Sequence, residues 1–331
     1  MRRDNLKNLP VRYYSSVSAR KVEWLWFPYI PYGKITVVQG DPGDGKTTLV
    51  LNLAAILSNG GVMPGSEDVV MKGKILYQSA EDGAEDTIKP RLISAGADCN
   101  QIAFIDDTEY PLSLDSPRLE SAIRETGANL LVLDPLQAYL GENGEMNRAE
   151  GIRPVLKKLA AVAGRTKCAI VVIGHMNKAA GTKGLYRGLG SIDIAATARS
   201  VLLIGRARSN PDLRVMVHLK SSLAREGRAI AFEIDGALGV HWLGECDVTA
   251  EELLSGAVPM PESGKVAAAE LLIQRMLIDG AKPCAVIYSQ GTDEGIGKRT
   301  IDTAKKKLKV KSEKRADGWY WSLYKEGEHG A

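Results

Sequence analysis

Residues 40–47 read Gly40-Asp41-Pro42-Gly43-Asp44-Gly45-Lys46-Thr47. This stretch matches the pattern GxxxxGK[ST], and it lies between an apolar run at 35–39 and a helical pattern at 47–57. Glycines let the backbone wrap closely around phosphate oxygens, and the N-terminus of the following helix adds a favourable dipole. The stretch therefore predicts a phosphate-binding loop between a strand and a helix; the alternative is a glycine-rich turn without a ligand.

The residues of this loop have distinct expected roles. Lys46 neutralises charge on the β- and γ-phosphates of a nucleotide, and the Thr47 hydroxyl coordinates Mg²⁺. Thr48 adds a hydroxyl contact. The nucleotide-binding residues are expected to be Gly40, Asp41, Pro42, Gly43, Asp44, Gly45, Lys46, Thr47 and Thr48.

Two further strand ends carry acidic residues. The apolar run at 130–133 ends in Asp134, which is placed to hold magnesium together with Thr47. The run at 74–78 leads to Glu81 and Asp82, and strand ends of parallel sheets face the ligand crevice. Glu81 is the expected general base for hydrolysis, with Asp82 as the alternative. The competing interpretation gives Asp82 a helix-capping role and leaves Glu81 in solvent.

The order of elements predicts an α/β protein. Short apolar runs at 35–39, 74–78, 102–105, 130–133, 169–174 and 201–204 alternate with helical patterns, which is typical of a mainly parallel sheet flanked by helices. The strands are apolar throughout, as expected when both faces are covered. Two runs at 214–220 and 229–235 are expected to extend one edge of the sheet as a hairpin.

Changes in composition divide the chain. We expect an N-terminal arm at 1–21, an ATPase core at 22–245, an acidic linker with prolines and glycines at 246–264, a small domain at 265–325 and a tail at 326–331. In the small domain, three helical patterns precede a hairpin around 317–318, and this order indicates a winged helix.

Composition excludes several classes of protein. The chain has 331 residues, of which 44% are hydrophobic and 25% charged, as in globular proteins that bury a core. Its apolar runs are shorter than the roughly 20 residues that a membrane span needs, so a cytoplasmic protein is expected. Four scattered cysteines predict neither a zinc site nor a disulfide framework.

Positive charge gathers near the C-terminus. Residues 298–315 contain nine Lys/Arg and two Asp/Glu, a local charge of +7, while the other 313 residues together carry about −4. On a helix over 298–309, an apolar stripe leaves basic side chains outward that are expected to bind DNA phosphates: Lys298, Arg299, Lys305, Lys306 and Lys309. A protein-docking winged helix is the main alternative.

These motifs, in this order, resemble the RecA-like ATPases, and more narrowly the RepA/DnaB-like hexameric helicase branch of plasmid and phage replication modules. The resemblance covers about 22–244 and rests mainly on residues 40–48, 78–92, 131–135 and 171–178. It implies ATP and Mg²⁺ as cofactors and Glu81 as the catalytic glutamate. It also implies that His175 senses the γ-phosphate; a structural histidine is the alternative.

The resemblance further implies a ring with shared sites. Two loops at about 141–150 and 178–189 would face single-stranded DNA in the pore, the second through Lys178, Lys183 and Arg187. A neighbouring subunit would supply a cation to each ATP, and the candidates are Lys220, Arg225 and Arg199. The sequence departs here from the compact Lys-x-Arg pair of the DnaB branch, which leaves the acting residue open.

The sequence thus predicts an ATP-hydrolysing, DNA-dependent motor. We expect a homo-oligomer, as a hexamer, that acts as a replicative helicase or helicase-like ATPase of a mobile element. Single-stranded DNA would lie in the pore, duplex DNA at the winged helix, and a primase or other replication protein would be a partner. The alternatives are an ATP-switched DNA-binding regulator or loader without unwinding, and a RecA-type recombinase.

Overall fold

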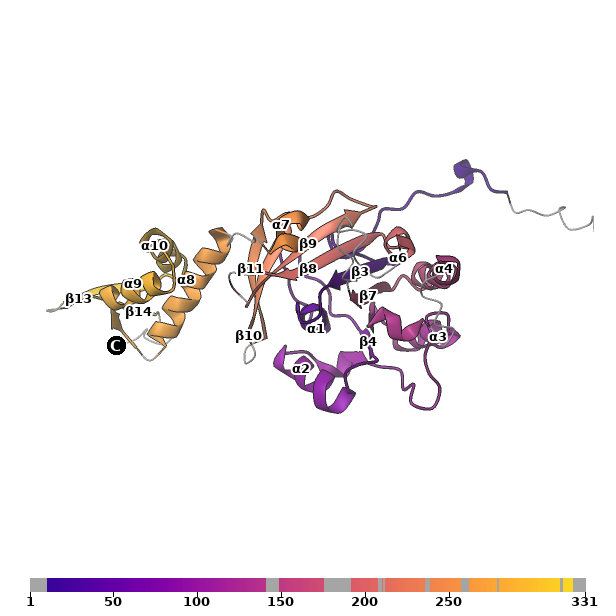
Figure 1. The fold of residues 1–331 in the computed structure, drawn as a ribbon, viewed down its shortest axis with the longest axis horizontal. Coiled ribbons are helices and arrows are strands. Elements are labelled where there is room, and N and C mark those ends of the chain that lie inside the picture. Colours follow the sequence, from indigo (N-terminus) through magenta and orange to yellow (C-terminus); the bar gives the residue numbers. More distant parts are fainter. Residues whose placement is uncertain are drawn as a thin grey trace, which may run out of the picture.

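A nine-stranded sheet forms the centre of the computed structural model (Figure 1). Its strand order is β11-β10-β9-β8-β3-β7-β6-β4-β5. The structure describes residues 11–140, 149–175, 192–207, 210, 212–235, 239–256, 262–278, 280–315 and 318–323. This mixed α/β architecture with a mostly parallel sheet is the RecA-like P-loop NTPase fold that the sequence predicts.

Six parallel strands make up the greater part of the sheet. They are β3 (Ile35–Gly40), β4 (Ile75–Ser79), β5 (Ile102–Ala103), β6 (Leu130–Asp134), β7 (Ala169–His175) and β8 (Ser200–Arg206). Every residue of β3 and β6 is buried, which explains why these strands are apolar on both faces instead of alternating. Their carboxyl ends meet at one edge of the sheet.

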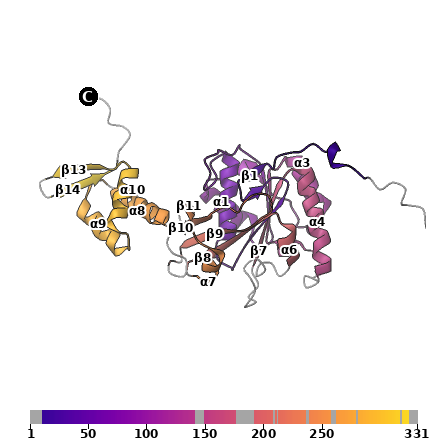
Figure 2. The same cartoon turned by 90° about the horizontal axis from the view of Figure 1, so that it is seen from above.

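Helices cover both faces of the sheet (Figure 2). On one face lie α1 (Lys46–Asn59) and α2 (Lys89–Ser94), packed on side chains such as Val38 and Val132. On the other lie α3 (Pro117–Thr126), α4 (Ala149–Thr166) and α6 (Ile192–Thr197), packed on the alternate residues Val37 and Leu131. The short pair β1 (Trp24–Trp26) and β2 (Ile30–Pro31) precedes β3.

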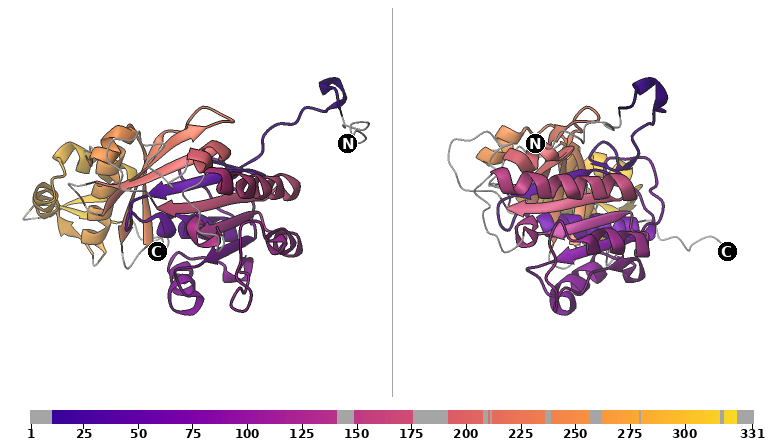
Figure 3. Two further views of the ribbon diagram at one scale, coloured as in Figure 1. Left: turned by 45° about the vertical axis from the view of Figure 1, so that its right-hand side comes forward. Right: turned by 90° about the vertical axis from the view of Figure 1, so that its right-hand side faces the viewer.

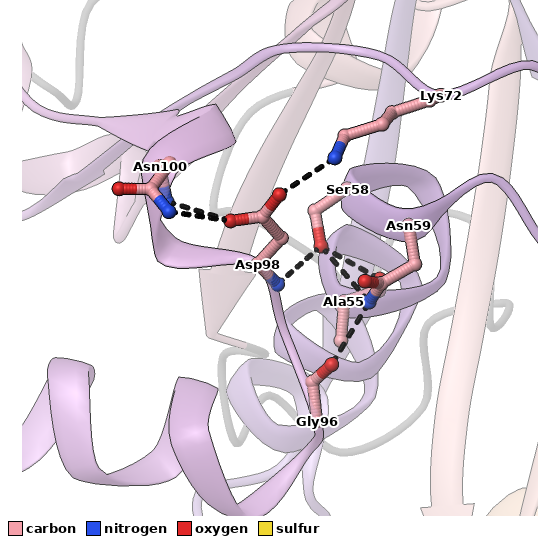
Figure 4. Close-up of polar contacts among 7 residues, drawn as sticks. All are labelled: Ala55, Ser58, Asn59, Lys72, Gly96, Asp98 and Asn100. Carbon is pink, nitrogen blue, oxygen red and sulfur yellow. Dashed lines mark hydrogen bonds and ion pairs between the residues drawn. The ribbon is translucent and has the colours of Figure 1, made fainter.

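The C-terminal end of α1 is fixed by a polar network (Figure 4). The Asp98 backbone N–H donates to the Ser58 hydroxyl at 2.9 Å, and the Asn59 amide donates to the Gly96 carbonyl at 2.8 Å. Lys72 forms an ion pair with Asp98 at 2.6 Å. Because α1 is thereby anchored at one end, its other end, which carries the P-loop, is held at the carboxyl edge of the sheet.

Three antiparallel strands extend the sheet beyond β8. The predicted hairpin is confirmed as β9 (Leu213–Ser221) and β10 (Ala229–Asp235), and a third strand, β11 (Gly239–Cys246), follows at the edge. The sequence analysis did not predict β11. Its glycines, Gly239 and Gly244, both have positive φ and interrupt the strand pattern, whereas pairing with β10 stabilises it.

The structure also differs from the expected linker at 246–264. Part of this stretch forms α7 (Ala250–Ser255), which begins with a capping box between Thr249 and Glu252. Leu253 of this helix is buried in the cluster that includes Leu203 and Val215. Of the acidic residues in this stretch, Glu251 and Glu252 lie in the capped first turn of α7.

The C-terminal residues form a small unit beyond β11 (Figures 1 and 3). Its order is α8 (Glu262–Leu277), β12 (Lys282–Pro283), α9 (Cys284–Asp293), α10 (Lys298–Lys307), β13 (Lys311–Arg315) and β14 (Gly318–Ser322). The strands make a sheet of order β12-β14-β13. A separate core, which includes Leu272, Ile301 and Trp321, joins the helices to this sheet.

The N-terminal segment from residue 11 extends away from the sheet in Figure 3 and exposes Tyr13 and Tyr14. Among the described residues, none of the helices combines the length and apolar character needed to cross a bilayer.

Candidate nucleotide-binding site

The P-loop lies between β3 and α1 at the carboxyl edge of the sheet. Its backbone needs glycine at two points. Gly45 caps α1 with a φ of 89°, and a Cβ there would collide with the Ile234 side chain. At Gly40 a Cβ would collide with the Ile204 carbonyl of the neighbouring strand. The glycines of the motif thus permit both the turn and the close packing on β8 and β10.

Lys46 is held inside the loop. Its ammonium donates to the carbonyls of Gly40 at 3.0 Å and Asp41 at 2.8 Å. Burial lowers the pKa of Lys46, and the carboxylates of Asp44 and Asp134 oppose this effect. The side chain is only 5% exposed, so its charge acts in a region of low dielectric, where it interacts strongly with phosphate.

Thr47 and Asp134 converge on one point. The Thr47 hydroxyl donates to Oδ2 of Asp134 at 2.7 Å, although 87 residues separate them in sequence. Asp134 is buried, and this raises its pKa; the hydrogen bonds from Thr47 and Tyr77 act in the opposite direction. A hydroxyl and a carboxylate at this separation are the oxygen ligands that Mg²⁺ takes in P-loop sites, so the residues present fit that ion.

Glu81 and Asp82 follow β4 close to Asp134, since both carboxylates contribute to raising its pKa. They differ in their surroundings. The Asp82 carboxylate forms an ion pair with Arg91 at 2.8 Å, and the Asp82 backbone N–H donates to the Ser79 hydroxyl. Glu81 is exposed at the P-loop side, where its charge also acts on Lys46. Both acids thus lie near Asp134, and Asp82 is held by Arg91.

His175 is the last residue of β7, and its Cα is in register with Gly40 at the start of the P-loop. The strand end therefore lies at the nucleotide edge, as expected for a γ-phosphate sensor. The proposed DNA contacts Lys178, Lys183 and Arg187 lie outside the described residues, as does most of the first pore loop.

The three candidates for a trans-acting cation lie at the opposite edge of the sheet. Ser221 at the end of β9 pairs with Ser200 at the start of β8, whereas the P-loop follows the far end of β3. The Lys220 ammonium donates to the carbonyls of Ala195 at 2.7 Å and Ala198 at 2.9 Å, so it caps α6 of its own chain. Arg225 and Arg199 are exposed. None of the three reaches the P-loop of its own chain.

Three residues of the site were missed by the sequence analysis. Tyr77 in β4 donates its hydroxyl to Oδ2 of Asp134 at 2.9 Å. Arg206, at the end of β8, donates to the carbonyl of Gly43. Arg214, near the start of β9, packs against Gly45. No motif marks them, because strand pairing brings Arg206 and Arg214 to the P-loop and Tyr77 to Asp134; the position of Tyr77 four residues before Glu81 was the one available signal.

A cavity of about 200 Å³ adjoins Thr48. It opens between the first turns of α1, the helix α2 and the adjoining ends of β10 and β11, and its lining includes Asn52, Arg91 and Val240. It offers space beside the P-loop for the part of a nucleotide that extends beyond its phosphates.

The helix expected over 298–309 ends at Lys307, and Lys309 follows it with a positive φ. The basic side chains of α10 are mostly exposed, namely Lys298, Arg299, Lys306 and Lys307, and Lys309 beyond the helix is exposed as well. Lys305 is partly buried over the Trp321 ring, with its ammonium 4.4 Å from the ring centroid. The apolar residues Ile301 and Ala304 face the small core. The helix therefore presents a positively charged face to solvent, and the Trp321 ring packs under Lys305 on the side of the small core.

Comparison with known proteins places the chain in a family. Residues 2–181, more than half of the chain, match the family model AAA_25, described as an AAA domain. The chain belongs to the AAA_25 family. Together with the P-loop and Asp134, this membership makes the chain a RecA-like P-loop ATPase.

Relatives and solved structures extend the comparison. The chain is 29% identical over 151 residues to the DNA repair protein RadA of Halalkalibacterium halodurans, covering 44% of this chain and 28% of that protein. It is 24% identical over 227 residues to RadA of Streptococcus pyogenes serotype M3, covering 68% and 44%. The chain thus spans less than half the length of these curated relatives.

Two solved structures are also similar. A KaiC-like protein of Pyrococcus horikoshii OT3 has a TM-score of 0.47 and 21% identity, with 64% of this chain and 90% of that chain covered. The RadB recombinase has a TM-score of 0.47 and 19% identity, with 64% and 91% covered.

Proposed function

We propose that this protein is a DNA-dependent ATPase that works as a homo-oligomeric motor on DNA. The observation that carries the proposal is the combination of a complete nucleotide site with a basic helix, α10, on a separate small unit of the same chain. Lys46, Thr47, Glu81 and Asp134 supply the chemistry, and the nine Lys/Arg of residues 298–315 supply the affinity for a polyanion.

The catalytic step follows from the positions of the acids. Glu81 would orient and deprotonate the attacking water, while Lys46 would stabilise the charge that develops on the phosphate oxygens. Thr47 and Asp134 would hold Mg²⁺, which neutralises charge on the phosphates when bound. His175, at the end of the strand beside the P-loop, would report the presence of the γ-phosphate to the segment that follows it.

A shared site between subunits fits the placement of the remaining cations. Arg225 and Arg199 are exposed at the sheet edge opposite the P-loop, so each can reach a nucleotide only in another copy of the chain. Arg225 and Arg199 are better trans-acting candidates than Lys220, because the Lys220 ammonium already caps α6. An assembly that buries each ATP between two copies, as in a hexameric ring, would use them.

The small C-terminal unit is proposed to be a winged helix that binds duplex DNA. Its order of helix, strand, helix, helix and two strands supports this, with α10 as the helix that meets phosphates and β13–β14 as the wing. Single-stranded DNA would be bound by Lys178, Lys183 and Arg187. In its most specific version, the proposal is that the protein is a replicative helicase with a primase as its partner.

ATP turnover measured with and without single-stranded DNA tests the proposal. We expect DNA to increase turnover several-fold in the wild type, and Lys46→Ala to abolish turnover under both conditions. Turnover by a stable monomer that DNA does not change would overturn the proposal.

A second candidate function is strand exchange. It is favoured by the similarity of 68% of this chain to the DNA repair protein RadA of Streptococcus pyogenes. A forked duplex with a labelled strand separates the two: a helicase displaces the strand with ATP alone, whereas a recombinase needs a homologous duplex. An ATP-switched regulator would bind DNA and do neither.

A further inference from the structure

Two arginines of the same chain lie beside the P-loop on adjacent strands. Arg206 and Arg214 are directly opposite each other in the antiparallel pair β8–β9. Arg206 is exposed and donates to the carbonyl of Gly43. Arg214 is 8% exposed, and its Cδ and Nε would lie 3.1 Å from a Cβ placed on Gly45. Both guanidinium groups therefore adjoin the phosphate-binding loop.

Two arginine charges placed so close together destabilise the folded protein unless an anion binds between them. Like charges directly opposite on paired strands destabilise a sheet, and a buried cation is expensive without a partner. Among the described residues, no carboxylate forms an ion pair with either guanidinium; Arg214 donates only to the carbonyl of Asp212, at 2.8 Å. The Nε of Arg214 is buried and has no hydrogen-bond partner among the residues that the structure describes.

The charges already present do not explain the pair. The Asp44 carboxylate acts on both arginines, yet it accepts from the Asp41 backbone N–H at 2.8 Å and belongs to the loop. The Asp212 carboxylate also acts on Arg214, without forming an ion pair with it among the described residues. Burial and the neighbouring Arg206 lower the pKa of Arg214, so the charge of Arg214 is held in unfavourable surroundings. A ligand with several negative charges would relieve this repulsion.

We propose that Arg206 and Arg214 form a second cationic subsite for the phosphate chain of the nucleotide, on the side of the P-loop away from Asp134. Lys46 holds the phosphates from within the loop, and the arginine pair holds them from the β8–β9 side. The subsite belongs to the same subunit as the P-loop, unlike the trans-acting cations considered above. The inference rests on nucleotide binding at the P-loop.

Replacements at Arg206 separate this role from a purely structural one. Arg206→Gln keeps a donor for the Gly43 carbonyl and removes the charge, whereas Arg206→Lys keeps the charge. We expect Arg206→Gln to weaken the binding of a fluorescent ATP analogue about tenfold and Arg206→Lys to weaken it less than about threefold. Arg20→Gln, on the exposed N-terminal segment, is the matched control and should bind as the wild type does.

Thermal stability gives an independent readout. Because the pair is repulsive, Arg206→Gln should raise the melting temperature measured without nucleotide, and it should reduce the additional rise produced by ATP. Arg214→Lys, which keeps the buried charge but loses the planar fork, should weaken ATP binding without unfolding the protein.

Each outcome has one meaning. If Arg206→Gln binds ATP as tightly as the wild type, the inference is wrong. It is also wrong if Arg206→Gln has a lower melting temperature than the wild type and Arg206→Lys loses as much affinity for ATP as Arg206→Gln does. In either case the two arginines only stabilise the conformation of the loop. If the wild type itself binds no ATP, the proposed function fails. In that case inorganic triphosphate tests the arginines directly, and equal binding by the wild type and Arg206→Gln would overturn the subsite.

Discussion

Single side chains determine how the candidate site treats metal and water. Oδ2 of Asp134 accepts hydrogen bonds from both Thr47 and Tyr77, so the orientation of this carboxylate is set from one helix, α1, and one neighbouring strand, β4. Tyr77 is buried, and its hydroxyl has no contact with the P-loop in the described structure other than through Asp134. It is a positioning residue in this arrangement, because it acts on the ion through the carboxylate.

Tyr77→Phe should therefore weaken Mg²⁺ binding about tenfold, the loss typical when a group that orients a metal ligand is removed. Burial already raises the pKa of Asp134, and losing a donor to the carboxylate raises it further. The acid limb of the Mg²⁺-dependent ATP affinity should move to higher pH. Titration of Mg²⁺ against nucleotide binding at several pH values measures this; an unchanged affinity and profile would show that Thr47 alone orients Asp134.

Glu81→Gln and Asp82→Asn test the choice between the two acids. We expect Glu81→Gln to slow ATP hydrolysis by about 10² to 10⁴-fold with ATP binding retained, since a general base contributes that much. Asp82→Asn breaks an exposed ion pair with Arg91 and should change turnover by no more than a few-fold. Single-turnover hydrolysis compares them, and the reverse order of effects would assign the base to Asp82.

Among the elements, β9 runs from the edge of the sheet that carries the P-loop to the opposite edge, where α6 ends. Arg214 at its start adjoins the P-loop, whereas Lys220 near its end caps α6. Between them, His218 is buried, and its Nδ1 accepts the Gly227 backbone N–H at 2.9 Å. Nε2 then carries the proton and donates to the Ser200 hydroxyl at 3.0 Å. This histidine fastens the loop that carries Arg225 to the sheet.

Lowering the pH should weaken the contribution of His218 to the stability of the protein. Burial lowers the pKa of His218 to about 4, below the value of 6.5 in an unfolded chain, so the neutral form contributes stability that is complete above pH 6.5. As the pH falls from 6.5 towards 4, the unfolded state binds the extra proton and the free energy of unfolding should drop by up to about 3 kcal/mol. Urea unfolding at each pH measures this loss.

His218→Asn provides the control for that prediction, because an amide oxygen can accept from Gly227 but does not titrate in this range. Its stability should depend less on pH between 6.5 and 4 than that of the wild type. Parallel curves for the two proteins would mean that other groups cause the acid sensitivity.

At the level of the whole molecule, charge is divided between two units. The sheet and its helices carry the nucleotide site, and the C-terminal unit carries the excess of positive charge in residues 298–315. Under the proposed function, such a division would let ATP and DNA bind to different surfaces of one chain. The affinity of α10 for DNA should then depend on salt, because phosphate contacts release counterions.

The double variant Arg299→Gln/Lys306→Gln should bind duplex DNA about tenfold more weakly at low salt. The slope of log affinity against log salt should fall by about two, one for each lost phosphate contact. Its ATP turnover without DNA should equal that of the wild type. Lys157→Gln, an exposed lysine of α4, is the matched control. Equal duplex affinity and slope in the double variant would exclude α10 as a DNA contact.

Local patterns in the sequence were sufficient for most of the fold. The P-loop motif fixes a strand, a turn and a helix within a few residues, and apolar runs predict β6 and β7 because strands buried on both faces have no room for polar residues. Glu81 and Asp134 could be found in the same way, since each follows such a run. The positive charge of α10 is likewise visible in composition.

Contacts between distant segments needed the tertiary structure. Tyr77 reaches Asp134 across 57 residues, and Arg206 reaches Gly43 across 163, so neither pair leaves a local pattern. The same holds for β11, which depends on pairing with β10, and for Lys220, whose ammonium meets the end of α6. Strand pairing and burial bring these groups together, and one sequence without its folded contacts records neither.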